Sequence, residues 1–157
     1  MRTTPDTNIL VRAAVRPFGP AGQILDRSTL PPHALVLSDQ ILDEVRRVLQ
    51  YDRIRQLAGL SDDEREEWIA LVAAVSEVVS PTEIVPVCQD PDDDVVVATA
   101  IEGRADVICT LDRHLLTPLV QAYCATFQIR VMTDVELLTE LRSTEPTEGN
   151  PAAERED

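Results

Sequence analysis

The sequence predicts a three-layer α/β/α fold with a mostly parallel central sheet. Segments with the character of buried strands alternate with amphipathic helices, and this alternation is typical of a parallel sheet covered by helices on both faces. The 157 residues suit a single domain that is large enough to bury a core. We expect that domain to span residues 1–142, followed by a disordered acidic tail over residues 143–157.

The first half of the chain supplies two predicted strands and four helices. A short N-terminal strand leads to Asp6 and is followed by a helix over 8–16. The Pro and Gly content of 17–22 predicts a loop, and a short helix follows over 23–28. The apolar run 34–37 predicts a buried parallel strand, and Ser38 is placed to cap a long helix whose apolar face includes Val45. Ser61 and Glu64 form a capping-box pattern that opens a helix with an expected apolar stripe of Trp68, Leu71, Val72 and Val75.

The second half predicts two further strands near the C-terminus. Residues 77–80 fit either a short strand or the end of the preceding helix. Acids at the start of 90–103 and Gly103 at its end favour a buried helix over a strand. Strands are expected at 105–110 and 129–132, and Thr133 caps a last helix to about 142. Beyond it no periodicity survives, which predicts the disordered tail.

The composition excludes several classes of function. The chain contains no lysine, which excludes P-loop, Schiff-base and receiver-domain chemistry, and its two histidines belong to no zinc-binding pattern. The net charge of −14 is unlike that of a plain electrostatic RNA binder but fits a site for a divalent cation. We expect a cytoplasmic protein with no membrane partner. The cysteines are scattered, no apolar segment is long enough to cross a membrane, and the N-terminus does not resemble a signal peptide.

Four carboxylates in separate segments form the candidate site: Asp6, Glu44, Asp93 and Asp112. Each also has an ordinary explanation, namely a helix cap for Asp6, an ion pair with Arg47 for Glu44, a helix-dipole partner for Asp93 and an Asx-turn for Asp112. In an open α/β sheet, however, sites lie beyond the carboxyl ends of the strands, where Asp6 and Asp112 are expected. Hard oxygen ligands select Mg²⁺ or Mn²⁺, and one or two such ions are a standard device for phosphodiester hydrolysis.

Four stretches together resemble a PIN domain, the ribonuclease fold of bacterial toxin–antitoxin toxins (VapC-like). They are 6–11, 37–49, 90–100 and 105–112. The resemblance implies that Asp6, Glu44, Asp93 and Asp112 bind the metal and carry catalysis, with Thr7, Asn8, Asp94, Thr110 and His114 in support. It further implies a homodimer, an RNA substrate and a basic antitoxin protein. Pro5, Leu111 and His114 depart from the residues that the family usually has at these positions.

Arginines near these segments are candidates for contacts with phosphate, and for most of them solubility is the alternative explanation. The candidates are Arg12, Arg16, Arg46, Arg47 and Arg113. The function we expect is that of a metal-dependent endoribonuclease acting as the toxin of a toxin–antitoxin pair. The alternatives are a catalytically inactive PIN-like module that binds other proteins, a nuclease acting on DNA, and a metal-dependent phosphatase. The last is disfavoured because Asp6 is not part of a D-x-D motif.

Overall fold

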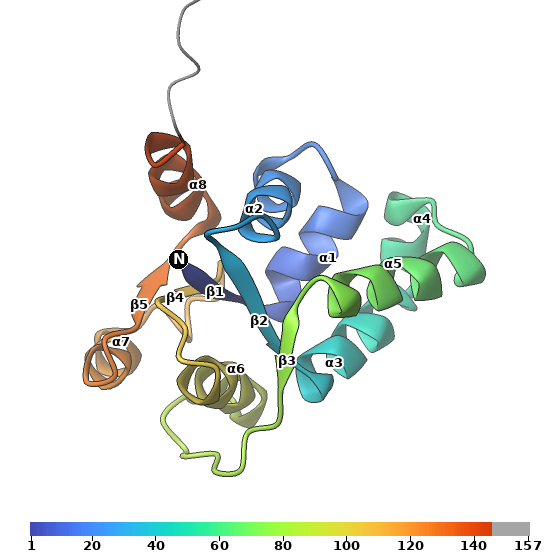
Figure 1. The fold of residues 1–157 in the computed structure, drawn as a ribbon. Coiled ribbons are helices and arrows are strands. Elements are labelled where there is room, and N and C mark those ends of the chain that lie inside the picture. The colour runs from blue at the N-terminus through green and yellow to red at the C-terminus, as the bar shows by residue number, and fades with distance from the viewer. Residues whose placement is uncertain (146–157) are drawn as a thin grey trace, which may run out of the picture.

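A computed structural model describes residues 1–145, and these form a five-stranded sheet between two layers of helices (Figure 1). All pairs of neighbouring strands are parallel, and the strand order is β3-β2-β1-β4-β5. This confirms the predicted fold class. The strands are β1 (Arg2–Pro5), β2 (Ala34–Ser38), β3 (Glu77–Val79), β4 (Val107–Cys109) and β5 (Arg130–Met132).

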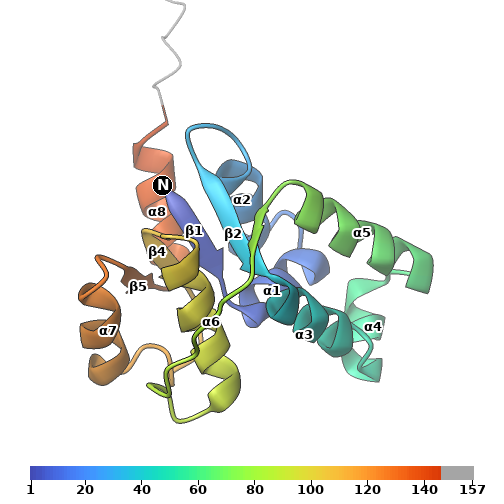
Figure 2. The same cartoon turned by 60° about the horizontal axis from the view of Figure 1, so that its bottom comes forward.

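The helices divide between the two faces of the sheet, as the two views show (Figures 1 and 2). Helices α6 (Pro91–Glu102) and α7 (Pro118–Ala125) cover one face. Helices α1 (Thr7–Val15), α2 (Pro20–Ser28) and α8 (Asp134–Ser143) cover the other. Helices α3 (Asp39–Leu49), α4 (Asp52–Ala58) and α5 (Asp62–Ala74) form a group beyond the β3 side of the molecule.

Three predicted N-terminal caps are confirmed. Ser38 accepts a hydrogen bond from the Ile41 amide at the start of α3, and complete capping boxes open α5 at Ser61 and α8 at Thr133. Each satisfies backbone N–H groups that the first turn of a helix leaves without partners. Of the segment 77–80, Glu77–Val79 form the edge strand β3.

Some local predictions were wrong. Helix α2 begins at Pro20, inside the expected loop, because proline is favoured in the first turn of a helix. The buried face of α5 consists of Arg65, Ile69 and Val72, whereas Leu71 is 61% exposed. Gly103 does end α6, but with φ of −82° rather than in a left-handed conformation. Glycine is needed there because a Cβ would lie 2.0 Å from Val36 Cγ1 on β2.

Proline is accommodated at the end of the central strand β1. The Asp6 amide donates to the Cys109 carbonyl of β4, whereas the Met1 carbonyl accepts from the Ala34 amide of β2. Even-numbered residues of this strand therefore direct their backbone groups toward β4, and odd-numbered residues direct theirs toward β2. The pairing of β1 with β2 extends only to Thr3 and Leu35. Pro5 therefore lacks an N–H at a position where the ladder with β2 has ended, and proline does not break the sheet.

The last helix ends one residue beyond its expected end. Helix α8 includes Ser143, and the Glu145 carboxylate forms an ion pair with Arg27 of α2 at 2.6 Å. The rest of the expected acidic tail, residues 146–157, lies outside the described residues. Within residues 1–145, no helix combines the length and apolar character needed to cross a bilayer.

Candidate active site

Asp6 and Asp112 lie on either side of the point where the strand order of the sheet reverses. The chain builds β1, β2 and β3 outward in one direction and then returns to place β4 on the other side of β1. Asp6 directly follows β1, and Thr110 and Asp112 follow β4. The carboxyl ends of two strands that diverge in this way leave the crevice in which α/β proteins commonly bind ligands.

Thr110 links the two sides of this crevice. Its buried hydroxyl donates to Asp6 Oδ2 at 2.8 Å and accepts from the Asp112 amide at 2.9 Å. Asp6 is 4% exposed and occupies the N-cap position of α1, but its side chain makes no capping hydrogen bond. The cap explanation for Asp6 is therefore not what the structure shows. Asp112 does form the Asx-turn, because its Oδ1 accepts from the His114 amide at 2.8 Å.

Glu44 reaches the same edge of the sheet from α3. Its Oε2 accepts a hydrogen bond from the Thr7 hydroxyl at 2.6 Å, which joins α3 to the start of α1. Its Oε1 lies 3.5 Å from Arg47 Nη2, so the ion pair considered from the sequence is present as well. The Glu44 side chain is 27% exposed, and this leaves the carboxylate open to a ligand from solvent.

The acids at the start of α6 have different tasks. Asp90 is the N-cap and accepts from the Asp92 amide at 3.0 Å. Asp94 is buried, and its Oδ1 accepts from the backbone amides of Val87 and Cys88, so it fastens the segment before α6. Asp93 is 8% exposed, and its Oδ2 is buried without a hydrogen-bond partner among the described residues.

Burial and mutual repulsion raise the pKa of two of these carboxyls. Burial raises the pKa of Asp6 to about 6, with Asp112 and Glu44 adding to the rise, while hydrogen bonds from Thr110 and the Thr7 backbone oppose it. Burial likewise raises the pKa of Asp93 to about 7, and the charges of Asp112, Asp6, Asp90 and Glu44 contribute. Four carboxylates from separate segments therefore act on one another across this edge of the sheet.

The chemistry of these residues fits a hard divalent cation, although the side chains do not enclose a binding position for one. Among residues 1–145, no group of three or more acidic, histidine or cysteine side chains lies at the spacing of metal ligands. The carboxylates repel one another and accept instead from Thr7, Thr110 and the His114 amide. The partnerless Asp93 oxygen and the raised pKa values of Asp6 and Asp93 both indicate negative charge that a cation would stabilise.

The other candidate residues are placed unequally. The Thr7 hydroxyl donates to Glu44 and the Thr110 hydroxyl donates to Asp6. Asn8 is exposed, and so is His114, which contributes its backbone amide but makes no side-chain hydrogen bond within the described part of the chain. Asp94 is engaged in the loop before α6.

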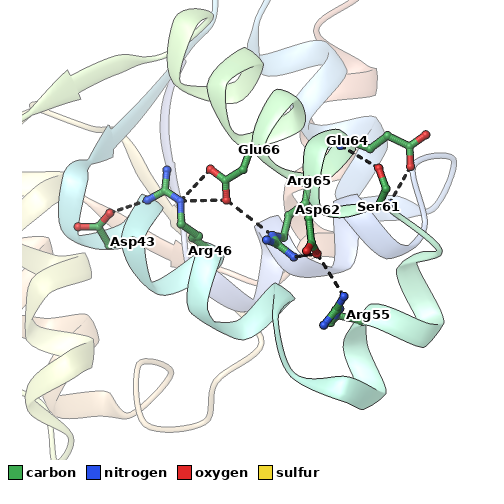
Figure 3. Close-up of polar contacts among 8 residues, drawn as sticks. All are labelled: Asp43, Arg46, Arg55, Ser61, Asp62, Glu64, Arg65 and Glu66. Atoms are coloured by element: carbon green, nitrogen blue, oxygen red, sulfur yellow. Dashed lines mark hydrogen bonds and ion pairs between the residues drawn. The ribbon is translucent and has the colours of Figure 1, made fainter.

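The candidate phosphate-binding arginines also differ from one another. Arg46 forms hydrogen bonds with Asp43 and Glu66, which hold it between α3 and α5 (Figure 3). Arg47 lies beside Glu44. Arg12 and Arg113 are exposed and form no ion pair within residues 1–145, so they remain available to a ligand.

A hollow beside Glu44 adds residues that the sequence did not single out. Its volume is about 340 Å³, and it is lined by Gln40, Asp43, Glu44, Arg47, Asp92 and Val95. On α3, Gln40 lies one helical turn before Glu44, and Asp43 directly precedes Glu44. Helical spacing from Glu44 was the available signal for them.

Comparison with known proteins assigns the fold to a family. Residues 2–114 match the family described as PIN domain, and this span includes all four site carboxylates. The chain belongs to the PIN-domain family. This PIN domain is 28% identical over 112 residues to an uncharacterized protein of Methanocaldococcus jannaschii, which covers 71% of each chain. No solved structure matches it. PIN domains are generally nucleases, that is, hydrolases that act on nucleic acid, and they typically use divalent metal ions.

Proposed function

We propose that this PIN domain is an endoribonuclease that depends on one or two Mg²⁺ or Mn²⁺ ions and hydrolyses phosphodiester bonds of RNA. The observation that carries the proposal is the buried Oδ2 of Asp93, which has no partner among the described residues and lies in the field of four other carboxylates. Keeping such a charge without a counterion is costly, and a folding role would be served better by an asparagine or an apolar residue. A cation-binding role explains why the acid is present.

Asp6, Glu44, Asp93 and Asp112 would hold the cation. A divalent ion supplies Lewis-acid stabilisation of the charge that develops on phosphoryl oxygens during hydrolysis. Thr110 fixes the orientation of Asp6, and Thr7 fixes that of Glu44, so two of the carboxylates are held in place before any ligand arrives. The backbone of the Asx-turn at Asp112 holds the third. Asp93 keeps a free oxygen for the ligand.

We further propose that the protein is the toxin of a toxin–antitoxin pair, acts as a homodimer and is inhibited by a basic antitoxin. The acidic edge of the sheet supports a basic inhibitor, since an arginine could occupy the position of the cation. RNA rather than DNA as substrate rests on the resemblance to VapC-like toxins. Growth arrest on induced expression, relieved by Asp93→Asn, would support the toxin role, and undisturbed growth would count against it.

A second candidate function is a PIN-like module that binds partner proteins without catalysis. The local partners that Glu44, Asp6 and Asp112 already have favour it, because each carboxylate is accounted for without a metal. Metal affinity separates the two candidates, since carboxylates that serve only as hydrogen-bond acceptors do not bind Mn²⁺ tightly.

The test is calorimetric titration of Mn²⁺ combined with a cleavage assay on single-stranded RNA and DNA. Asp93→Asn and Asp6→Asn each remove one ligand, and Asp63→Asn is the matched control because Asp63 is an exposed acid in the first turn of α5. We expect Mn²⁺ binding and RNA cleavage in the parent and the control, with both lost in the site variants. A folded parent that binds no Mn²⁺ would assign the acids to structure, and cleavage of DNA alone would assign the protein to the DNA nucleases.

A further inference from the structure

A groove of about 330 Å³ lies between α1 and α4. Its lining is mainly apolar, and two arginines of the α1 segment border it. The lining residues are Val11, Arg12, Val15, Arg16, Gly19, Pro20, Ala21, Ile54 and Leu57. Leu57 is 59% exposed, so part of this apolar surface faces solvent.

The two arginines of the groove form no ion pair within residues 1–145. Arg12 lies on α1 and Arg16 is the C-cap residue of this helix; both are exposed, and both line the groove. In a chain with a net charge of −14, arginines such as Arg46 and Arg130 are paired with carboxylates. Two neighbouring cations without acidic partners beside one apolar groove favour an anionic ligand.

An aromatic side chain stands next to this pair. Phe18 is 92% exposed, and it lies in the short segment between Arg16 and Gly19, both of which line the groove. The turn that carries it is fixed, because Gln23 Nε2 donates to the Phe18 carbonyl at 3.1 Å. A Cβ on Gly22 would lie 1.8 Å from the Pro17 carbonyl oxygen, which shows how closely the turn packs on α2. An aromatic ring held out into solvent by a rigid turn is suited to stacking.

The far wall of the groove is α4, a helix that is also linked to α5 by ion pairs. No residue of α4 is buried. Arg55 attaches this helix to α5 through Asp62, at 3.2 Å, and Asp62 also accepts from the buried Arg65 at 2.9 Å (Figure 3). These contacts fasten α4 to α5, while Ile54 and Leu57 line the groove opposite α1.

We propose that the α1–α4 groove is the binding subsite for a single strand of RNA, with phosphates on Arg12 and Arg16 and bases against Phe18 and the apolar lining. The ligand's identity rests on the proposed ribonuclease function. Basic grooves with exposed aromatic rings are the usual platform for single-stranded nucleic acid. Helix α1 joins the subsite to the candidate active site: Arg12 lies six residues after Asp6, about 9 Å along the helix at 1.5 Å per residue.

The test measures, by fluorescence anisotropy, the binding of a short fluorescein-labelled single-stranded RNA of mixed sequence. EDTA is present so that no cleavage occurs. The variants are the double substitution Arg12→Gln with Arg16→Gln, and Phe18→Ala, all at exposed positions. Arg104→Gln is the control, because Arg104 is exposed on the turn between α6 and β4 and outside the groove. Thermal melting of each variant checks the fold.

We expect the double variant to bind RNA at least tenfold more weakly at low salt. Because each phosphate contact on a single strand contributes about 0.7 to the slope of log K against log salt, its slope should fall by about 1.4. Phe18→Ala should weaken binding about tenfold with the slope unchanged, since stacking releases no counterions. Unchanged affinity in both variants, or a parent that binds no RNA, would overturn the proposal.

A second probe separates an RNA site from a protein site. A labelled peptide of alternating glutamate and leucine offers the same charge and apolar character without bases. If the groove variants lose this peptide but keep RNA, the groove binds an acidic protein segment and the proposal is wrong. Hydrolysis of bis(p-nitrophenyl) phosphate with Mn²⁺ reports on the carboxylates alone. A parent inactive on it that still binds RNA through the groove would refute the ribonuclease function and leave the subsite standing.

Discussion

Replacing Asp93 with asparagine should make the metal-free protein more stable at pH 8. The pKa of this carboxyl rises from 3.8 to about 7 in the folded state, so the folded protein binds more protons than the unfolded chain between these values. The free energy of unfolding therefore falls as the pH rises through this window, and the full loss is present above pH 7. An asparagine side chain has the same shape as the aspartate and no charge, so the substitution removes this loss of stability.

The size of the effect follows from the same pKa. A rise of about three pH units corresponds to about 4 kcal/mol. Asp93 lies in the first turn of α6 at the open edge of the sheet, where water can reach a reoriented carboxylate and salt screens the neighbouring acids. We therefore expect about half of that value, a gain of ~2 kcal/mol at pH 8. At pH 5.5 the folded carboxyl is largely protonated and the gain should be about half as large.

The assay is urea unfolding followed by far-UV circular dichroism in EDTA, at pH 8 and at pH 5.5, which stays above the sequence pI of about 4.4. Asp63→Asn is the control: an acid in the first turn of α5 favours the helix dipole, so its loss should cost ~0.3–1 kcal/mol. Added Mn²⁺ should stabilise the parent and not the Asp93 variant. An Asp93 variant that is less stable than the parent at pH 8 would refute the reasoning, because Asp93 would then be an ordinary dipole partner.

Three further substitutions test the scaffold around the site, each by urea unfolding. Asp94→Ala leaves two partly buried amides before α6 without an acceptor and should cost roughly 2–4 kcal/mol; a cost under 1 kcal/mol would show that the loop is not fastened there. Gly22→Ala forces a Cβ to within 1.8 Å of the Pro17 carbonyl and should cost at least ~2 kcal/mol, whereas a neutral result would mean that the turn shifts freely. Ser61→Ala breaks its half of the capping box with Glu64 and should cost ~1 kcal/mol, and an unchanged midpoint would remove the cap from the account of α5.

The features that the sequence predicted well are those with a local physical cause. Ser38, Ser61 and Thr133 were predicted as caps because a hydroxyl before an apolar periodic run satisfies backbone N–H groups wherever the helix packs. The apolar run that forms β2 and the alternation of strands and helices are also local features of the sequence, and they predicted the fold class. The positions of Asp6 and Asp112 at strand ends followed directly from that topology.

What the sequence did not predict depends on neighbours that are distant or irregular. Helix α4 has seven residues and none of them is buried, so its few apolar positions are too short a pattern to predict a helix. The inward face of α5 contains Arg65, whose guanidinium pairs with Asp62 while its stem is buried, and an apolar pattern search passes over an arginine. Asp94 resembled its neighbours in the sequence because the amides that it binds belong to an irregular segment before α6. Thr117 followed by Pro118 is a usable sequence signal for the start of α7, because proline is favoured in the first turn of a helix.

The central position of β1 has a consequence for the time at which the site can exist. This strand is synthesised first, yet its two partners, β2 and β4, begin about 30 and 100 residues later. Thr110, which fixes Asp6, and Asp112 come at the end of that span, so a nascent chain has no complete acidic cluster until almost the whole domain has left the ribosome. Contacts this distant in sequence also slow folding. A chain truncated before β4 would hold Asp6 on an unpaired strand edge, and the proposed metal binding should therefore appear only once the domain is complete.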